Sequence, residues 1–190
     1  MLEKIQQTAD YLRSKVADMP HVAIILGTGL GPIADIIENK TVIPYKEIPN
    51  FPVSTVQGHS GNFIFGELGG KRVMAMQGRF HYYEGYDMKT VTFPVRVMRA
   101  LGVKTLIVSN AAGGMNKEFS VGDVMIITDH INLFPENPLR GKNYEELGVR
   151  FPAMTEAYSH RLVALADEIG REKGMRLMNG VYVGTTGPTF

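Results

Sequence analysis

The chain has 190 residues, 44% of them apolar, and a formal net charge of +1 from 20 basic and 19 acidic side chains. A charge so close to zero argues against a nucleic-acid-binding protein that neutralises phosphate groups. The sequence contains no cysteine, which excludes a disulfide framework, a thiolate nucleophile and a cysteine-ligated metal.

The first ten residues and the lengths of the apolar runs indicate in which cellular compartment we expect the protein. Residues 1–10 are too polar for a signal peptide. No apolar run approaches the roughly 18 residues that a membrane span requires. We therefore expect a cytoplasmic protein with no membrane partner.

The first part of the chain predicts a helix followed by strands. Residues 2–16 place apolar side chains three and four positions apart, which is typical of an amphipathic helix. Residues 22–26 are an uninterrupted apolar run, which indicates a strand buried on both faces. The runs at 63–68 and 72–76 flank Gly69-Gly70 and predict a β-hairpin.

The second part of the chain alternates helices and strands. Residues 88–101 have helical spacing, but Pro94 predicts that this helix starts late or kinks. Further elements are expected as buried strands at 103–108 and 124–127, a helix at 156–173 capped by Gly174, and a strand at 181–183. Residues 132–153, rich in Pro, Gly and Asn, predict a long loop, and such loops usually serve a function.

The order of these elements predicts the fold class. Buried strands mixed with helices and one hairpin indicate a single α/β domain over residues 1–190, with a mixed, twisted β-sheet flanked by helices. The sequence stops at residues 185–190, directly after a strand and a turn, so we expect a fragment of a longer domain.

The first candidate ligand segment is Gly27-Thr28-Gly29-Leu30-Gly31-Pro32, between a strand and a helix expected at 32–38. The glycines let backbone N–H groups approach an anion, and the helix N-terminus adds partial positive charge. The Thr28 hydroxyl can donate to a phosphate oxygen. A dinucleotide fingerprint would place the third glycine one residue later. A turn without any ligand is the competing interpretation.

The second candidate segment, residues 78–86, follows a predicted strand at the end where open α/β sheets bind ligands. In an extended backbone Arg79 and His81 project to the same side. An arginine fork beside an imidazole suits a dianionic oxyanion, and Tyr83 adds a hydroxyl. The alternative is a surface loop in which Arg79 pairs with Glu84.

Two weaker candidates contain small residues. His59 lies between glycines before the hairpin and is sterically open to a ligand, although a lone histidine is more often an ordinary polar residue. Residues 109–114 follow a predicted strand. Their side chains are small and leave room for a ligand against the backbone. A tight turn under close packing accounts for this segment as readily.

Several segments together resemble a known family. In this order and spacing, eight of them are closely similar to the trimeric purine nucleoside phosphorylases: residues 27–31, 58–59, 77–85, 91–96, 110–114, 129–133, 137–141 and 150–154. The resemblance covers nearly the whole chain. It implies a nucleoside phosphorylase-like fold, a homotrimer, and reversible phosphorolysis of purine nucleosides. Inorganic phosphate is a co-substrate of that reaction, so no cofactor or metal is implied.

Site residues carry over from the resemblance position by position. Arg79 and His81 are implied as the catalytic residues that hold the phosphate dianion. The resemblance further implies that phosphate is bound by Thr28, His59 and the Ala111 backbone. It implies that the nucleoside is bound by Ala111, Tyr83 and Tyr182, and that Phe151 covers the sugar of the neighbouring subunit.

The sequence departs from the family at its end. In the family a Glu-Thr pair and further base-binding residues follow the stretch that matches residues 187–190, so we expect little purine selectivity and very weak turnover from this chain alone. The alternatives are phosphorolysis of methylthioadenosine, a non-catalytic phosphate- or nucleoside-binding fragment and, more remotely, a nicotinamide-binding module.

Overall fold

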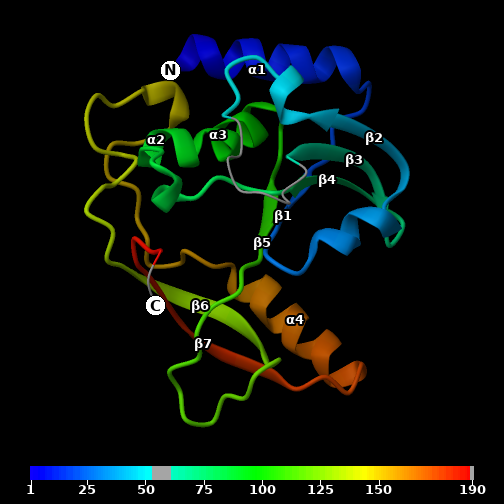
Figure 1. Ribbon diagram of the computed structural model, residues 1–190, viewed down its shortest axis with the longest axis vertical. Coiled ribbons are helices and arrows are strands. Elements are labelled where there is room, and N and C mark those ends of the chain that lie inside the picture. The colour runs from blue at the N-terminus through cyan, green and yellow to red at the C-terminus, as the bar shows by residue number, and fades with distance from the viewer. Residues whose placement is uncertain (53–60, 189–190) are drawn as a thin grey trace. The chain divides into compact units, whose positions relative to one another are not determined.

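The computed structural model describes residues 1–52 and 61–188 (Figure 1). The chain falls into two compact units, Met1–Ala111 (unit 1) and Ala112–Phe190 (unit 2). Each unit has its own sheet. That residues 1–190 form one phosphorylase domain stays a prediction.

Unit 1 is built on a five-stranded sheet in the order β2-β3-β4-β1-β5. Its strands are β1 (Val22–Leu26), β2 (Glu38–Pro44), β3 (Asn62–Leu68), β4 (Lys71–Gln77) and β5 (Thr105–Val108). β1 is parallel to β4 and β5, whereas β3 is antiparallel to β2 and β4. The expected α/β fold with a mixed sheet is confirmed. The sequence did not predict β2, because most of its side chains are exposed and break the apolar pattern.

The predicted hairpin between β3 and β4 is present. Its turn is Gly69-Gly70, with φ angles of 57° and 70°. Two successive left-handed residues are what a two-residue hairpin turn requires, and glycine adopts them without steric cost. The turn therefore sets the register that pairs Leu68 with Lys71 and Asn62 with Gln77.

Unit 1 also contains helical elements, of which the first precedes β1 and the others lie between strands. They are α1 (Leu2–Lys15), α2 (Met88–Val91) and α3 (Phe93–Ala100), with 3₁₀ turns η1 (Gly31–Ile36), η2 (Tyr45–Glu47) and η3 (Tyr82–Glu84). The helical pattern at 88–101 is divided at Thr92, and Pro94 lies in the first turn of α3. The predicted effect of this proline is confirmed, because a first turn tolerates a residue without an N–H.

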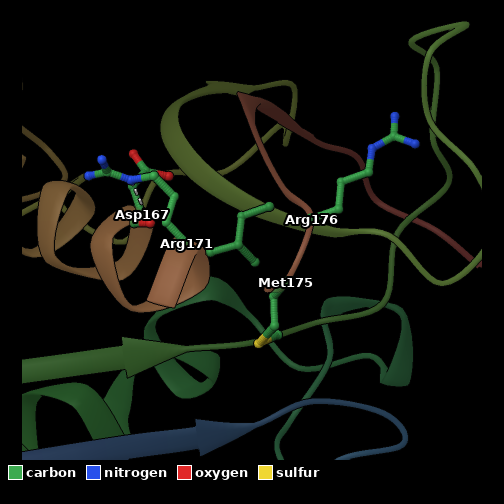
Figure 2. A pocket seen from close by; sticks show the side chains of 5 residues that line it. Asp167, Arg171, Met175 and Arg176 are labelled. Atoms are coloured by element: carbon green, nitrogen blue, oxygen red, sulfur yellow. Dashed lines mark hydrogen bonds between the residues drawn. The ribbon is translucent and has the colours of Figure 1, made fainter. Parts of the chain in front are cut away.

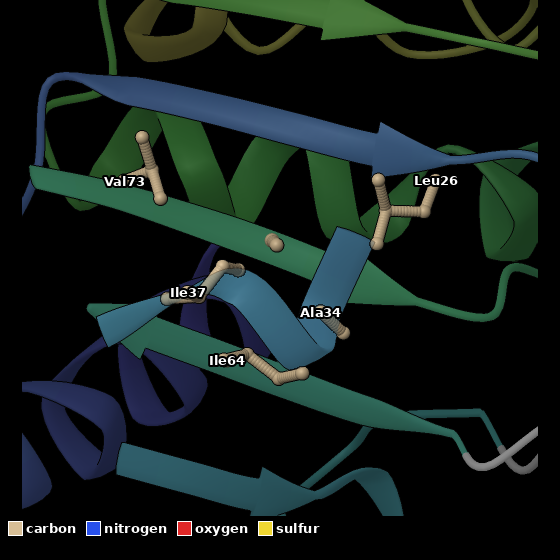
Figure 3. Packing of buried hydrophobic residues seen from close by; sticks show 6 residues of the cluster. Leu26, Ala34, Ile37, Ile64 and Val73 are labelled. Carbon is tan, nitrogen blue, oxygen red and sulfur yellow. The ribbon is translucent and has the colours of Figure 1, made fainter. Parts of the chain in front are cut away.

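Both faces of the unit 1 sheet are covered. One face packs against η1 through an apolar cluster (Figure 3) that consists of Leu26, Ala34, Ile37, Ile64, Val73 and Ala75. On the other face Phe63 is fully buried. Its ring centroid lies 5.2 Å from that of Phe51, which in turn lies 6.2 Å from Phe93 of α3. The core therefore surrounds the central strands that lead into the candidate site.

Unit 2 contains a two-stranded parallel sheet, β6 (Val124–Asn132) and β7 (Leu177–Gly184). The connection between them includes η4 (Glu145–Leu147) and α4 (His160–Glu172), the usual crossover between parallel strands. The side chain of Ser159 accepts a hydrogen bond from the Leu162 N–H and caps α4. Gly174, with a φ of 64°, ends the helix as predicted.

Two expectations about these elements are wrong in detail. α4 begins at His160 rather than at residue 156, because Ser159 provides the N-cap. The strands β5 and β6 exist, but they are not buried: Ile107 is 50% exposed and Val124 is also 50% exposed. β5 is one of the two edge strands of its sheet. An apolar run predicts a strand, whereas its burial depends on what packs against it.

Within the described residues, no helix combines the length and the apolar character that crossing a membrane demands.

Candidate functional site

Three of the sequence-predicted segments begin at one edge of the unit 1 sheet. β1 lies between β4 and β5 and is parallel to both (Figure 1). Leu26 at the end of β1 pairs with Gln77 at the end of β4, and Ile25 pairs with Val108 at the end of β5. The loops that start at Gly27, Gly78 and Ser109 therefore leave the sheet together, at its carboxyl edge.

Ser109 ties two of these loops to each other. Its backbone N–H and its hydroxyl both donate to the Ile25 carbonyl, at 3.1 and 3.0 Å. The same hydroxyl oxygen accepts the N–H of Gly27 at 2.9 Å. A single side chain thus fixes the first residue after β1 against the first residue after β5.

The close approach of these two loops requires glycine at position 27. A Cβ at this position would overlap the Ser109 carbonyl oxygen and would lie 2.7 Å from the Cα of Asn110. Gly29, the next glycine of the motif, has a φ of 86° and needs glycine for conformational reasons instead. The two glycines therefore serve different purposes in one turn.

Arg79 joins the third loop to this pair. Its Nη1 donates to the Ser109 carbonyl at 2.8 Å, and its Nε donates to Nε2 of His81 at 3.1 Å. The prediction that Arg79 and His81 lie on the same side of the chain is confirmed. A guanidinium is positively charged throughout the physiological pH range, so Arg79 brings a fixed positive charge to this edge.

Glu84 orients the imidazole of His81. The carboxylate oxygen Oε1 accepts the backbone N–H and the ring Nδ1 of His81, both at 2.8 Å. The two ring nitrogens of His81 therefore contact Arg79 through Nε2 and Glu84 through Nδ1. The Glu84 side chain is only 2% exposed. Arg79, His81 and Glu84 therefore form one hydrogen-bonded chain.

Tyr83 covers the other side of this histidine. Its ring is stacked on that of His81, with centroids 4.8 Å apart and an angle of 17° between the planes. Tyr83 itself is 48% exposed. The arrangement fixes the plane of the imidazole and leaves the tyrosine at the surface of the loop.

The segment after β1 differs from its prediction. The α-helix expected at residues 32–38 is the short 3₁₀ turn η1. A 3₁₀ turn of this length gives a much weaker helix dipole than a regular helix, so charge stabilisation by this turn is smaller than expected. Thr28 is exposed in the turn between β1 and η1, and Ala111 is exposed at the end of unit 1.

The structure brings some predicted site residues together and not others. Thr28, Arg79, His81, Tyr83 and Ala111 belong to the three loops at the carboxyl edge of the unit 1 sheet. His59 lies outside the described residues. Tyr182 and Phe151 belong to unit 2 and are described there.

Tyr182 lies on β7 beside a polar group of unit 2. It pairs in register with His130 of β6, whose ring contacts Tyr158 edge-on at a centroid distance of 5.7 Å. Burial raises the pKa of Tyr158, and the charges of Asp129 and Tyr182 raise it further. The buried Nδ1 of His130 has no hydrogen-bond partner among the described residues.

Two aromatic rings of the long loop lie in different environments. Phe134 is half-buried against Gly184, at whose position a Cβ would lie 3.0 Å from the ring. Phe151 is 87% exposed, and the guanidinium of Arg150 lies 5.8 Å from its ring centroid. Arg150 is held by the carbonyls of Leu139 and Gly141. Of the two rings, only Phe151 is available to a partner.

A hollow of about 480 Å³ lies at the end of α4 and the start of β7 (Figure 2). It is lined by Asp167, Arg171, Met175, Arg176 and Leu177, none of which is a predicted site residue. The Arg176 guanidinium extends away from Asp167 and Arg171 (Figure 2) and donates to the Glu118 carbonyl. The two arginines of this hollow do not converge on a common ligand position.

The sequence interpretation missed two side chains that organise the candidate site. Ser109 was considered only as the first of several small residues, although its hydroxyl and carbonyl join all three loops. Glu84 was considered as a partner of Arg79, whereas it accepts hydrogen bonds from His81. The spacing of three residues between His81 and Glu84, which is that of a capping box, is the signal that points to this pair.

Among the residues that the structure describes, no three His, Asp or Glu side chains gather in a way that could hold a metal ion.

Comparison with known proteins identifies relatives over almost the entire chain. The model of the phosphorylase superfamily matches residues 21–190. Purine nucleoside phosphorylase 1 of Geobacillus stearothermophilus is 57% identical over 186 residues, which cover 98% of this chain and 68% of that protein. The purine nucleoside phosphorylase of Rattus norvegicus is 51% identical over 193 residues, covering 99% of this chain and 67% of the rat protein.

Comparison with solved structures identifies the same family. A purine nucleoside phosphorylase in complex with ribose-1-phosphate superposes with a TM-score of 0.94 at 47% identity, covering all of this chain and 72% of its own. The Schistosoma mansoni enzyme in complex with inosine gives a TM-score of 0.94 at 46% identity, covering all of this chain and 68% of its own. The chain therefore belongs to the phosphorylase superfamily, and within it to the purine nucleoside phosphorylases.

Proposed function

We propose that this protein catalyses the reversible phosphorolysis of purine nucleosides, which yields the free purine base and ribose 1-phosphate. The observation that carries the proposal is the meeting of three loops at the carboxyl ends of β1, β4 and β5, with Arg79 bonded to both Ser109 and His81. The related enzymes form complexes with inosine, hypoxanthine and ribose-1-phosphate, which are nucleoside, base and sugar phosphate of this reaction.

In this reaction a phosphate oxygen bonds to the anomeric carbon of the ribose while the bond from that carbon to the purine nitrogen breaks. The electron pair of the broken bond leaves with the base, which takes up a proton. The transition state resembles an oxocarbenium ion, as in glycoside cleavage. Positioning and electrostatics dominate such a step. Phosphate supplies the attacking oxygen, so we propose that no side-chain nucleophile, metal or cofactor takes part.

We carry the proposed roles over from the resemblance to the family, and the contacts of Arg79 and His81 support two of them. Arg79 and His81 hold the phosphate dianion, and the contact of His81 with Glu84 keeps its ring in place. The other proposed contacts are Thr28, His59 and the Ala111 backbone with phosphate, and Ala111, Tyr83 and Tyr182 with the ribose.

We also propose a cytoplasmic homotrimer in which Phe151 covers the sugar of the neighbouring subunit. The support is the exposure of this ring on a loop that Arg150 holds in place. A loop donated in one direction to each neighbour closes into a ring, whereas a two-fold dimer would exchange loops reciprocally.

The test is phosphate-dependent release of hypoxanthine from inosine, with ribose 1-phosphate measured in the same samples. We expect the two products in equal amounts, no release without phosphate, and the same rate after treatment with a metal chelator. Release of adenine from methylthioadenosine with inosine untouched would favour the methylthioadenosine enzyme. Phosphate binding without turnover of either nucleoside would indicate a non-catalytic binding protein.

A further inference from the structure

A buried tyrosine contacts the start of the loop that carries Arg79 and His81. The hydroxyl of Tyr45, in η2, donates a hydrogen bond of 2.7 Å to the carbonyl of Gly78. Tyr45 is only 2% exposed, and Gly78 is also buried. The reaction proposed above uses neither of these groups, so their hydrogen bond needs a separate explanation.

The surroundings of Tyr45 keep its hydroxyl in one position. Its ring packs against Phe51, Phe63 and Phe80, with centroid distances of 5.0, 5.6 and 5.4 Å. Its backbone N–H donates to the Gly61 carbonyl at 2.8 Å. Burial raises the pKa of Tyr45 well above its usual value, so the hydroxyl stays protonated and remains a donor.

The Gly78 carbonyl is the point at which the chain turns from β4 into the anion-binding loop. Gly78 has a φ of 95°, a conformation that is favourable only for glycine. The residues that follow alternate: Arg79 and His81 bond to each other, while Phe80 between them is 3% exposed and packs on Tyr45. Tyr45 therefore contacts the loop on both sides of Arg79, by its hydroxyl at Gly78 and by its ring at Phe80.

We propose that Tyr45 is a positioning residue for the phosphate site, acting through Gly78 and Phe80 to hold Arg79 and His81 where both reach the same anion. This inference rests on the proposed function. Tyr45 has no direct contact with phosphate in this role; it reduces the number of conformations that the loop adopts before phosphate binds, and such preorganisation strengthens binding.

The test compares two variants that each lose one buried hydroxyl. Tyr45→Phe keeps the aromatic packing and removes only the hydrogen bond to Gly78. Thr8→Val is the matched control: Thr8 is fully buried in unit 1, and its hydroxyl reaches the Pro49 carbonyl, four residues after Tyr45, at 2.7 Å. Urea unfolding gives the stability of each variant, and titration calorimetry with inorganic phosphate gives its Kd.

We expect Tyr45→Phe to raise the Kd for phosphate about tenfold, the lower end of the loss of affinity seen when a group that orients a metal ligand is removed. Thr8→Val should leave that Kd within about twofold of the native value, although its loss of stability is similar. An unchanged phosphate Kd in a folded Tyr45→Phe protein would overturn the inference. So would an equal rise in both variants, because that would reflect a general loss of stability.

A second variant covers the case in which Tyr45→Phe does not fold. Phe80→Leu keeps the hydroxyl bond and loosens the other contact of Tyr45 with the loop, so it should also raise the phosphate Kd severalfold; a native Kd there contradicts the inference. A native protein that does not bind phosphate at all would instead refute the proposed function, and with it this role of Tyr45.

Discussion

The side chains at the candidate site depend on one another through shared hydrogen-bond partners. Ser109 accepts from Gly27 through its hydroxyl and from Arg79 through its carbonyl. His81 stands between Arg79 and Glu84. A change at one of these positions therefore alters the geometry at the others, and the effects of combined mutations should not be additive.

Replacing Arg79 by alanine should reduce turnover about 100- to 1,000-fold, because the loss of one charge-stabilising donor typically costs about 2.7–4 kcal/mol of barrier. The measurement is kcat/KM for inosine at saturating phosphate. Arg72→Ala is the control: Arg72 lies near the start of β4, the strand that precedes the loop of Arg79, and forms an exposed ion pair with Asp18. Equal losses in both variants would contradict a role for Arg79 in catalysis.

Gly27→Ala should destabilise unit 1 by about 1–3 kcal/mol, because its Cβ would overlap the backbone of Ser109 and Asn110. The displaced loops should also weaken phosphate binding. Gly31→Ala, in the same motif, is the control, since no atom lies within 4 Å of its added Cβ. Urea unfolding of both variants measures the difference; equal stability would mean that the two loops do not approach as closely as described.

Among the secondary-structure elements, α2 shows how a nearby side chain determines where a helix begins. α2 begins after Asp87, whose carboxylate accepts the Thr90 N–H at 2.7 Å. Hydrogen bonds from Thr90, from its side chain first and then from its backbone, hold the pKa of Asp87 below its ordinary value. This cap connects the loop of Arg79 to the helices that cover the sheet.

The lowered pKa predicts a pH dependence of stability. The contribution of Asp87 is present above the ordinary pKa of an aspartate and is lost as pH falls through the lowered pKa of the folded state. Asp87→Ala should therefore reduce stability by about 1 kcal/mol at about pH 7, and by less in acid. Asp87→Asn keeps an acceptor that does not titrate, so its difference from Asp87→Ala should stay constant with pH. Urea unfolding at several pH values measures both differences.

At the scale of the whole molecule, the proposed assembly makes a prediction about one exposed side chain. Phe151→Ala should raise the KM for nucleoside and change stability by less than about 0.5 kcal/mol, because the ring is 87% exposed within its own chain. Val149→Ala, 73% exposed on the same loop, is the control and should leave KM unchanged. Light scattering gives the oligomeric state; full activity in a monomeric protein would contradict a site shared between subunits.

The sequence alone predicted the features that depend on residues close to one another along the chain. Gly69-Gly70 specified the hairpin because two left-handed residues in succession are available to glycine. Pro94 specified the break between α2 and α3, and Gly174 the end of α4. The segments at Gly27 and Arg79 were predicted as anion sites because each combines suitable donors with the end of an apolar strand.

The remaining features depend on residues that are far apart in the sequence. Only the strand order places β1 between β4 and β5, and with it the loops of Gly27, Arg79 and Ser109 at one edge. Ser109 and Tyr45 bond to residues 82 and 33 positions away, and no periodicity or motif reports such a contact. The exposure of Ile107 was missed for the same reason, because apolar character favours burial but only packing partners provide it.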